Sequence, residues 1–272
     1  MVITLADADF SANNIGRVPS AELDSTTKAL LQFYTRFDNE SEIAWKLNDW
    51  VLALKDANLW NRITALYMPW ISSNMTQAKT NYITKVAGVE TNMSFANGAL
   101  SATANGGKIT LSEGINAINF HCLIRENISF SSPRINGIDG DSKRLVLQTP
   151  GATSDKPVVQ KLSNSSVQSG YYIPSGTTFD SGTMLWEIGS LSALEQNALV
   201  NGVAPSVGGN YDQSTEPLGT KLTEYIPTSN ANAPNSCIFF SGDGNSITAA
   251  QRAVILEACN TLRTYLINAD NA

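Results

Sequence analysis

The residues of this chain that could catalyse a reaction are few, and their spacing forms no recognised catalytic set. Its single histidine, His121, lies in the apolar run from Asn119 to Ile124, which is typical of a strand. One histidine cannot supply a two-histidine zinc motif, and no G-x-S-x-G stretch presents a serine for a catalytic triad. We therefore expect His121 to be a structural residue of the core or of a strand edge.

A pair of carboxylates is the other catalytic set to consider, because glycosidases use two acids about 5 to 10 Å apart. Jelly-roll enzymes of this kind tend to place acids at alternating positions of one strand, where the side chains share a face. The candidate acids of this chain stand singly, at Glu113, Glu187, Glu195, Glu216 and Glu224. The sequence therefore predicts no catalytic residues and a protein that is not an enzyme.

Two Asp-Gly stretches, Asp139-Gly-Asp141 and Asp243-Gly-Asn245, could offer oxygen ligands to calcium. Neither follows the EF-hand loop, and aspartate and glycine are also the commonest turn residues. Cysteines occur only at Cys122, Cys237 and Cys259, which is too scattered for a zinc site or a disulfide framework. We interpret these features as turns and buried thiols, and we predict no metal and no cofactor.

Four aromatic residues are the candidates for ligand binding. Tyr171, Tyr172 and Tyr211 lie in polar stretches rich in glycine and serine, and Trp70 follows Pro69 where the helical block closes. An exposed ring can stack on the apolar face of a sugar or fill a pocket of a partner protein. We predict these four rings as binding residues, with core packing as the alternative for each. Three further tryptophans are predicted core residues of helices: Trp45, Trp50 and Trp60.

The elements that position these residues begin with a helical block. Apolar residues recur at i, i+4, i+7, i+8 and i+11 from Ile43 to Leu54, which predicts an amphipathic helix. Asn39 with Glu42 resembles its N-terminal cap and reciprocal acid. An earlier helix is predicted to begin at residue 24 or 25, and a short third one to cover Leu59 to Leu66.

The end of the chain is predicted to be helical again. Thr248-Ala-Ala-Gln251 has the spacing of a capping box, and an apolar stripe at helical spacing follows from Val254 to Leu266. Such a stripe must be buried. We expect this helix and the N-terminal helices to cover the same side of the β-rich middle, with both termini on that side.

Between about residues 82 and 241, short β-branched and apolar runs alternate with clusters of Gly, Pro, Asn and Ser. Three Asn-Gly pairs, at 97–98, 136–137 and 201–202, lie between apolar flanks and suit two-residue type I′ hairpin turns. Because strands do not alternate with helices here, the pattern predicts an antiparallel sandwich or barrel. The predicted strands are Tyr82 to Val86, Lys108 to Leu111, Ile115 to Ile124, Leu145 to Leu147, Pro157 to Leu162, Met184 to Ile188, Leu222 to Ile226 and Cys237 to Phe240.

These patterns predict a mostly β fold with flanking helices, divided into four parts. An extended arm covers residues 1–20, a helical block 21–70, a β-sandwich 71–245 and a C-terminal helix 246–272, which packs on the sandwich with the helical block. The arm has little periodicity, so we expect it to be ordered only against a partner or a neighbouring subunit.

Composition limits the class of protein further. Of the 272 residues, 42% are hydrophobic, which is enough for a sizeable core. Charged residues are only 15% of the chain, against roughly 25% in an average soluble domain, which suits a β-rich extracellular or assembly protein. The net charge of −6, without a basic stripe, argues against nucleic acid as a partner.

The sequence also predicts no membrane partner. No apolar run reaches the roughly 18 residues of a membrane-spanning helix. The segment from Met1 to Phe10 lacks the basic and apolar parts of a secretory signal, so we expect the chain to be made in a cytoplasm.

Four stretches that are spread over most of the chain carry a family resemblance. They are residues 8–17 (ADFSANNIGR), 58–67 (NLWNRITALY), 197–203 (NALVNGV) and 239–252 (FFSGDGNSITAAQR). With the order of helices and strands, they resemble bacteriophage virion proteins that carry a concanavalin A-like, laminin G-like jelly roll. The resemblance implies a concanavalin A-like jelly-roll antiparallel β-sandwich. The metal-binding residues of legume lectins have no counterpart here.

The resemblance implies a non-enzymatic fibre, decoration or tail component of a virion, made in the host bacterial cytoplasm and often a homo-oligomer. We expect the arm to bind other virion proteins, and the jelly roll to serve assembly or to bind a host-surface glycan. Two alternatives stay open. One is a stand-alone lectin-like carbohydrate-binding module that uses the tyrosines, and the other is a hydrolase of surface polysaccharide.

Overall fold

The fold is taken from a computed structural model. It describes residues 23–104, 106–116, 120–125, 137–139, 143–148, 158–163, 167–172, 183–191, 196–200, 206–207, 221–225, 236–245 and 247–271. The predicted arm over residues 1–20 and the Asn-Gly pair at 201–202 lie outside these ranges.

Helices lie at both ends of the described chain. The α-helices are α1 (Ser25–Phe33), α2 (Glu42–Asp56), α3 (Met75–Ala78) and α4 (Ala249–Asn271), and the short 3₁₀ helices are η2 (Trp60–Arg62) and η3 (Pro69–Ile71). The two longest, α2 and α4, are those whose apolar spacing is clearest in the sequence, which confirms both predictions.

The strands of the described chain follow one another with short spacing. They are β1 (Ile63–Tyr67), β2 (Val89–Thr91), β3 (Met93–Ala96), β4 (Ala99–Ala102), β5 (Lys108–Asn116), β6 (Phe120–Arg125), β7 (Gly137–Asp139), β8 (Lys143–Gln148), β9 (Val158–Ser163), β10 (Val167–Tyr172), β11 (Thr183–Leu191), β12 (Gln196–Val200), β13 (Ser206–Val207), β14 (Lys221–Tyr225) and β15 (Ser236–Gly242). Every pairing between these described strands is antiparallel, as predicted.

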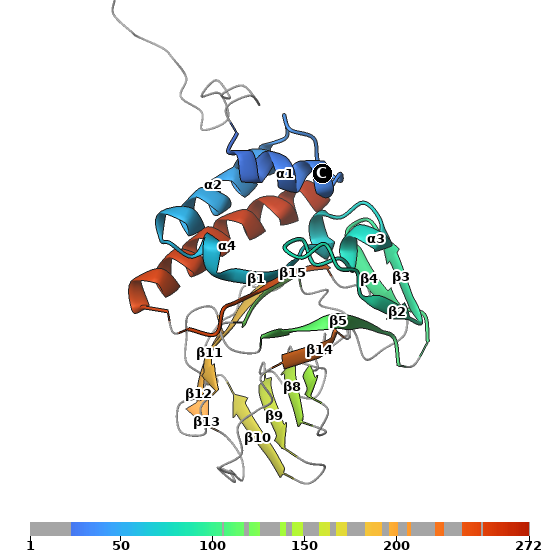
Figure 1. The fold of residues 1–272 in the computed structure, drawn as a ribbon, viewed down its shortest axis with the longest axis vertical. Coiled ribbons are helices and arrows are strands. Elements are labelled where there is room, and N and C mark those ends of the chain that lie inside the picture. The colour runs from blue at the N-terminus through green and yellow to red at the C-terminus, as the bar shows by residue number, and fades with distance from the viewer. Residues whose placement is uncertain are drawn as a thin grey trace, which may run out of the picture.

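The strands form two five-stranded sheets and two smaller ones. The larger sheets have the orders β1-β15-β6-β11-β12 and β13-β10-β9-β8-β7, and the smaller ones are β14-β5-β2 and the hairpin β3-β4. Helices α1, α2 and α4 lie together over the β1–β15 side, while β8, β9 and β10 lie at the far end of the molecule (Figure 1). The fold is therefore an assembly of antiparallel sheets that helices cover on one side.

The helices cover the sheet through a single apolar core. Leu47, Trp50 and Leu54 lie on one side of α2 and are almost fully buried, because a period of 3.6 residues aligns them. They share a cluster of buried side chains with Leu262 of α4 and Phe240 of β15. Burial of this shared stripe is what fixes the helical layer on the sheet.

Strand β15 is central to the fold, since it pairs with β1 on one side and with β6 on the other. Its first six residues are all buried, which explains the continuous apolar run within it. Phe240 belongs to the core under the helices. On the opposite face, the ring of Phe239 stacks on Tyr67 with ring centroids 4.7 Å apart.

One of the predicted helix caps is confirmed and another is wrong. The carboxylate of Asp24 accepts a hydrogen bond from the Thr26 backbone at 2.8 Å and begins α1, as predicted. The cap of α2 is Ser41, whose hydroxyl accepts from the Ala44 backbone at 3.1 Å. The prediction of a cap at Asn39 is therefore wrong by two positions.

The predicted third helix, Leu59 to Leu66, is also wrong. Only Trp60–Arg62 forms a 3₁₀ turn, and the chain then extends as β1, where Leu66 pairs with Phe240 of β15. The boundary placed at residue 70 between the helical block and the sandwich therefore does not hold, because β1 belongs to the sheet that the helices cover.

Two smaller strand and turn predictions also fail. Residues 82–86 form a turn and not a strand, closed by a 2.9 Å hydrogen bond from the Asn81 backbone N–H to the Val86 carbonyl. Gly137 lies in β7, opposite Leu145 of β8, and is not a turn residue; Asn136 lies outside the described residues.

The Asn97-Gly98 turn confirms the first predicted hairpin. It joins β3 to β4, with φ of 50° at Asn97 and 75° at Gly98, as a type I′ turn requires. A Cβ at Gly98 would lie 2.2 Å from a terminal nitrogen of Arg36 and 2.4 Å from the Trp70 carbonyl oxygen. This turn is therefore both left-handed and in close contact with its neighbours.

We expect Gly98→Ala to lower the free energy of unfolding by about 2 kcal/mol, because the methyl group adds a clash to the left-handed backbone. Gly106→Ala is the matched control, because Gly106 has φ of 81° but nothing within 4 Å of the added Cβ. It should lose only about 1 kcal/mol. Urea unfolding of both variants measures the difference, and equal losses would contradict the proposed close contact.

Candidate functional site

The four predicted ligand-binding aromatics do not form one described site. Tyr171 and Tyr172 are consecutive residues of β10, opposite Val207 and Ser206 of β13. Tyr211 lies outside the described residues. Trp70 lies in η3 and belongs to the buried core cluster that includes residues of α2 and α4.

Trp70 is not an exposed binding ring, contrary to the prediction, because its side chain is completely buried. Its indole N–H donates to the Asp270 carboxylate near the end of α4 at 2.8 Å. Arg36 donates to the same carboxylate and, at 2.5 Å, to the Trp70 backbone carbonyl. We call Arg36, Trp70 and Asp270 the terminal clamp, since they fix the end of α4 to two earlier segments of the chain.

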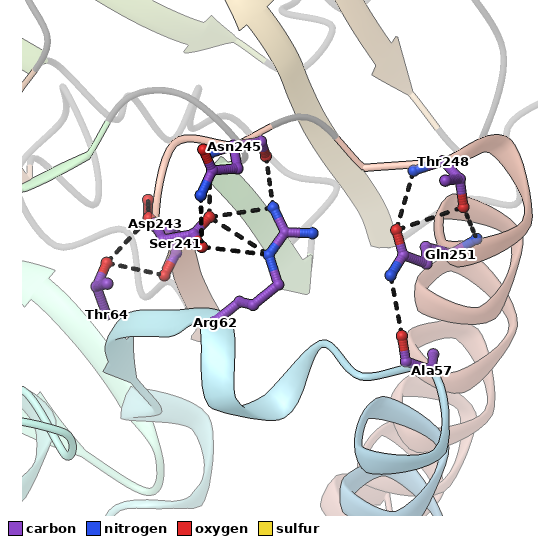
Figure 2. Close-up of polar contacts among 9 residues, drawn as sticks. Ala57, Arg62, Thr64, Ser241, Asp243, Asn245, Thr248 and Gln251 are labelled. Carbon is purple, nitrogen blue, oxygen red and sulfur yellow. Dashed lines mark hydrogen bonds and ion pairs between the residues drawn. The ribbon is translucent and has the colours of Figure 1, made fainter.

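The Asp-Gly turn at 243–245 is held by Arg62 (Figure 2). Arg62 donates to the Asp243 carboxylate at 3.0 Å and to the Asn245 carbonyl at 2.7 Å. The Asn245 amide donates to the other carboxylate oxygen of Asp243 at 2.9 Å. The cluster therefore connects η2 to the turn between β15 and α4.

The chemistry of this cluster indicates a structural role. The hydrogen bond from Arg62 lowers the pKa of the Asp243 carboxyl to about 2, so the group is an ionised acceptor at neutral pH and not a proton donor. Within the described ranges, no group of three or more His, Cys, Asp and Glu side chains could hold a metal ion. Of the other Asp-Gly stretch, only Asp139 is described, as the last residue of β7.

A pH dependence follows from the lowered pKa of Asp243. Above pH 4, the free energy of unfolding of the native protein should be about 0.5–1 kcal/mol greater than that of Arg62→Gln. The difference is small because the ion pair is partly exposed. Since the folded-state pKa is depressed, this stabilisation is lost as the pH falls through about 2. Urea titrations between pH 2 and pH 7 test it, with Asp243→Asn as the second variant. A difference that stayed constant over that range would count against the ion pair.

A second polar group in Figure 2 joins α2 to α4. The Gln251 backbone N–H donates to the Thr248 hydroxyl at 3.2 Å, and the Thr248 backbone N–H donates to the Gln251 side chain at 3.0 Å, which confirms the predicted capping box. The Gln251 amide also donates to the Ala57 carbonyl at 2.9 Å. The last turn of α2 is therefore fixed beside the first turn of α4.

The remaining polar and sulfur candidates are dispersed. Glu113 accepts from the Thr84 hydroxyl at 2.5 Å, and Glu224 pairs with Lys108 across β14 and β5. His121 lies in β6, as its apolar run indicates, and Glu187 stands opposite it in β11. Glu195 and Glu216 lie outside the described residues. Cys237 and Cys259 are buried thiols, as predicted.

The described surface is hollowed between α2 and α4, at a place that the sequence does not indicate. The groove has a volume of about 480 Å³. Its lining residues are Lys46, Asp49, Trp50, Ala53, Asp56 and Ala57 of the α2 segment and Val254, Glu257, Ala258 and Thr261 of α4. We call this feature the α2–α4 groove.

No helix in the described part of the chain is both long and apolar enough to cross a membrane.

Comparisons with known proteins assign no family. No family model and no curated protein matches the chain. Among solved structures, a mutant of Trypanosoma rangeli sialidase displaying trans-sialidase activity aligns with a TM-score of 0.37 and 11% identity, over 80% of this chain and 39% of that one. A structure from work on botulinum neurotoxin type C, whose cell entry depends on two ganglioside molecules, aligns with a TM-score of 0.44 and 9% identity, over 77% of this chain and 53% of that one. The chain thus spans less than two thirds of either protein.

Proposed function

We propose that this chain is a non-enzymatic structural protein of a bacteriophage particle: a fibre, decoration or tail component. Its sheets form a concanavalin A-like jelly roll that serves assembly or attachment. The proposal is supported by the family resemblance of the stretches at 8–17, 58–67, 197–203 and 239–252 and by the antiparallel fold with its helical layer.

The observation that carries the proposal is the position of the two chain ends. Leu23, where the described chain begins, is buried in the helical core. The backbone N–H of Asp24 donates to Asn48 of α2 at 2.8 Å, and Lys55 of α2 donates to the Asp24 carboxylate at 2.6 Å. Asp270 is held in the same layer by the terminal clamp.

Both ends of the described chain therefore leave from one side of the molecule, and the sheet that contains β8, β9 and β10 lies at the other side (Figure 1). A module with this polarity can be attached to a particle through residues 1–20 while it presents the far sheet outward. In this arrangement the arm binds other virion proteins, and further copies of the chain assemble around it.

The test is incorporation into particles. Phage that encodes this chain is grown with either the full chain or a chain without residues 1–20, and the particles are purified and analysed by mass spectrometry. We expect the full chain in the particles and the shortened chain only in the lysate supernatant, with unchanged thermal unfolding because the helical core begins at Leu23. A full chain that is missing from purified particles would disprove the proposal.

Attachment to a host-surface glycan is the second part of the proposal, and it concerns the far sheet. Tyr171 and Tyr172 lie in β10, the strand between β9 and β13 of that sheet. Aromatic rings contribute strongly to recognition where they are exposed. On a glycan array we expect binding that the double change Tyr171→Ala plus Tyr172→Ala removes, while incorporation into particles persists. Binding that survives the double change would exclude these two rings.

A further inference from the structure

The α2–α4 groove lies between two antiparallel helices. The antiparallel direction follows from three contacts: Lys46 lies over the Tyr265 ring, Trp50 donates to Cys259, and Gln251 donates to Ala57. On α2 the lining runs from residue 46 to residue 57, which corresponds to about 16 Å at 1.5 Å per residue. The channel is therefore as long as three turns of a helix.

The floor of the groove is apolar and its side chains are small. Ala53 and Ala57 line it from the α2 side, and Val254 and Ala258 line it from α4, above the buried ring of Trp50. Small side chains allow the axis of a third helix to come close to both helices, and the space of about 480 Å³ can accept several side chains. The shape thus suits a helix that lies along the channel.

The rim of the groove is acidic. Three carboxylates, those of Asp49, Asp56 and Glu257, line it together with one base, Lys46. Lys46 donates to Asp49 at 3.3 Å and so offsets one of the three. In the described part of the chain, Asp56 and Glu257 have no such ion-pair partner. Two carboxylates on opposite helices are therefore available to basic groups of a ligand.

The N-terminal segment of this chain does not match the groove in charge. Residues 1–22 contain Asp7, Asp9 and Glu22 and only one base, Arg17. Like charges near an acidic rim are repelled, so the occupant should come from another protein.

We propose that the α2–α4 groove binds a basic amphipathic helix of a partner protein. Small apolar side chains of that helix lie on the floor, and Lys or Arg side chains on its two edges pair with Asp56 and Glu257. This is the helix-in-groove mode of recognition, in which apolar residues at i, i+3, i+4 and i+7 supply the anchors. The inference depends on the groove and its charges, and it holds for a partner protein inside or outside a virion.

The probe is a synthetic helical peptide of Ala, Leu and Lys, about 16 residues long so that it is helical in water. A peptide with Glu in place of Lys is its charge control. Binding of both to the full chain is measured by fluorescence anisotropy, and the site is mapped from amide chemical-shift changes. We expect the Lys peptide to bind, the Glu peptide not to bind, and the shifts to centre on Ala53, Ala57 and Ala258.

Two double variants of equal net charge distinguish binding at the groove from general electrostatic attraction to the chain. Asp56→Asn plus Glu257→Gln changes the rim, and Glu90→Gln plus Glu113→Gln changes two exposed acids of the sheet β14-β5-β2; both take the net charge from −6 to −4. We expect the rim double to weaken Lys-peptide binding about three- to tenfold and the sheet double to leave it within about twofold.

A third variant, Thr261→Lys, puts a base on the exposed lining of α4 and should weaken the same binding without affecting the fold. Equal losses in the two doubles, equal binding of the two peptides, or shifts away from the groove would each overturn the proposal. These outcomes are independent of the particle test, so a negative result here leaves the virion proposal standing, and a chain missing from particles leaves the groove proposal standing.

Discussion

Replacing Trp50 by alanine is expected to lower the free energy of unfolding by about 4 kcal/mol, the largest loss that we predict for this chain. The side chain is only 1% exposed. Its ring lies edge-on to Trp60 at 5.8 Å and to Phe240 at 5.7 Å, and its indole N–H donates to the Cys259 sulfur at 3.4 Å. One residue of α2 thus contacts η2, β15 and α4, so its removal opens a cavity where all three meet.

Urea unfolding followed by far-UV circular dichroism measures this loss. Trp50→Phe keeps a six-membered ring and should lose about 1.5 kcal/mol, because it leaves a smaller cavity than Trp50→Ala does. Leu52→Ala is the control on the same helix, since Leu52 is 38% exposed; it should change stability by less than about 0.5 kcal/mol. A loss at Trp50→Ala no greater than at Leu52→Ala would show that α2 does not hold the sheet through this ring.

The parts of the fold that the sequence predicts are those specified by local spacing. The apolar residues of α2 recur at helical intervals, and the Thr248–Gln251 capping box makes its hydrogen bonds within four residues of chain. The Asn97-Gly98 turn is likewise local, since its positive φ values are a property of the two residues themselves. Each of these predictions is confirmed without knowledge of any distant segment.

The predictions that fail depend on residues far away in the chain. The segment from Ile63 to Tyr67 extends because β15, more than 170 residues later, pairs with it, and tertiary pairing overrides its helical spacing. Trp70 is predicted as an exposed ring at the end of the helical block, yet it is buried, and its N–H donates to Asp270. Neither partner could be inferred from the local sequence.

The candidate site shows the same limit. Alanines at 53 and 258 and acids at 56 and 257 lie in two well-predicted helices, and Ala57 is the C-cap of the first. The patterns of these helices do not show that they are antiparallel neighbours. Trp50 and Cys259, which are in contact, are separated by more than 200 residues. A groove between two helices is a property of their packing, so the separate periodicities indicate which faces are buried but not what lies between them.

The terminal clamp gives the second large effect: Asp270→Ala should lower the free energy of unfolding by about 3 kcal/mol, because breaking a buried ion pair leaves its partner unpaired. The Asp270 side chain is only 5% exposed and that of Arg36 only 18%. Without the carboxylate, the indole N–H of Trp70 loses its acceptor, and the guanidinium of Arg36 loses its charged partner and keeps the Trp70 carbonyl as an acceptor. The last turn of α4 should then separate from η3.

Urea unfolding of Asp270→Ala and amide hydrogen exchange of the last turn of α4 measure the two effects. Asp270→Asn should lose less, about 1.5 kcal/mol, since the amide oxygen can still accept from Trp70. The matched control is Asp49→Ala, which removes an exposed pair whose carboxylate is 55% accessible and should lose less than about 1 kcal/mol. If Arg36→Ala in the Asp270→Ala background costs as much as it does in the native chain, the two residues are not coupled and the clamp does not exist.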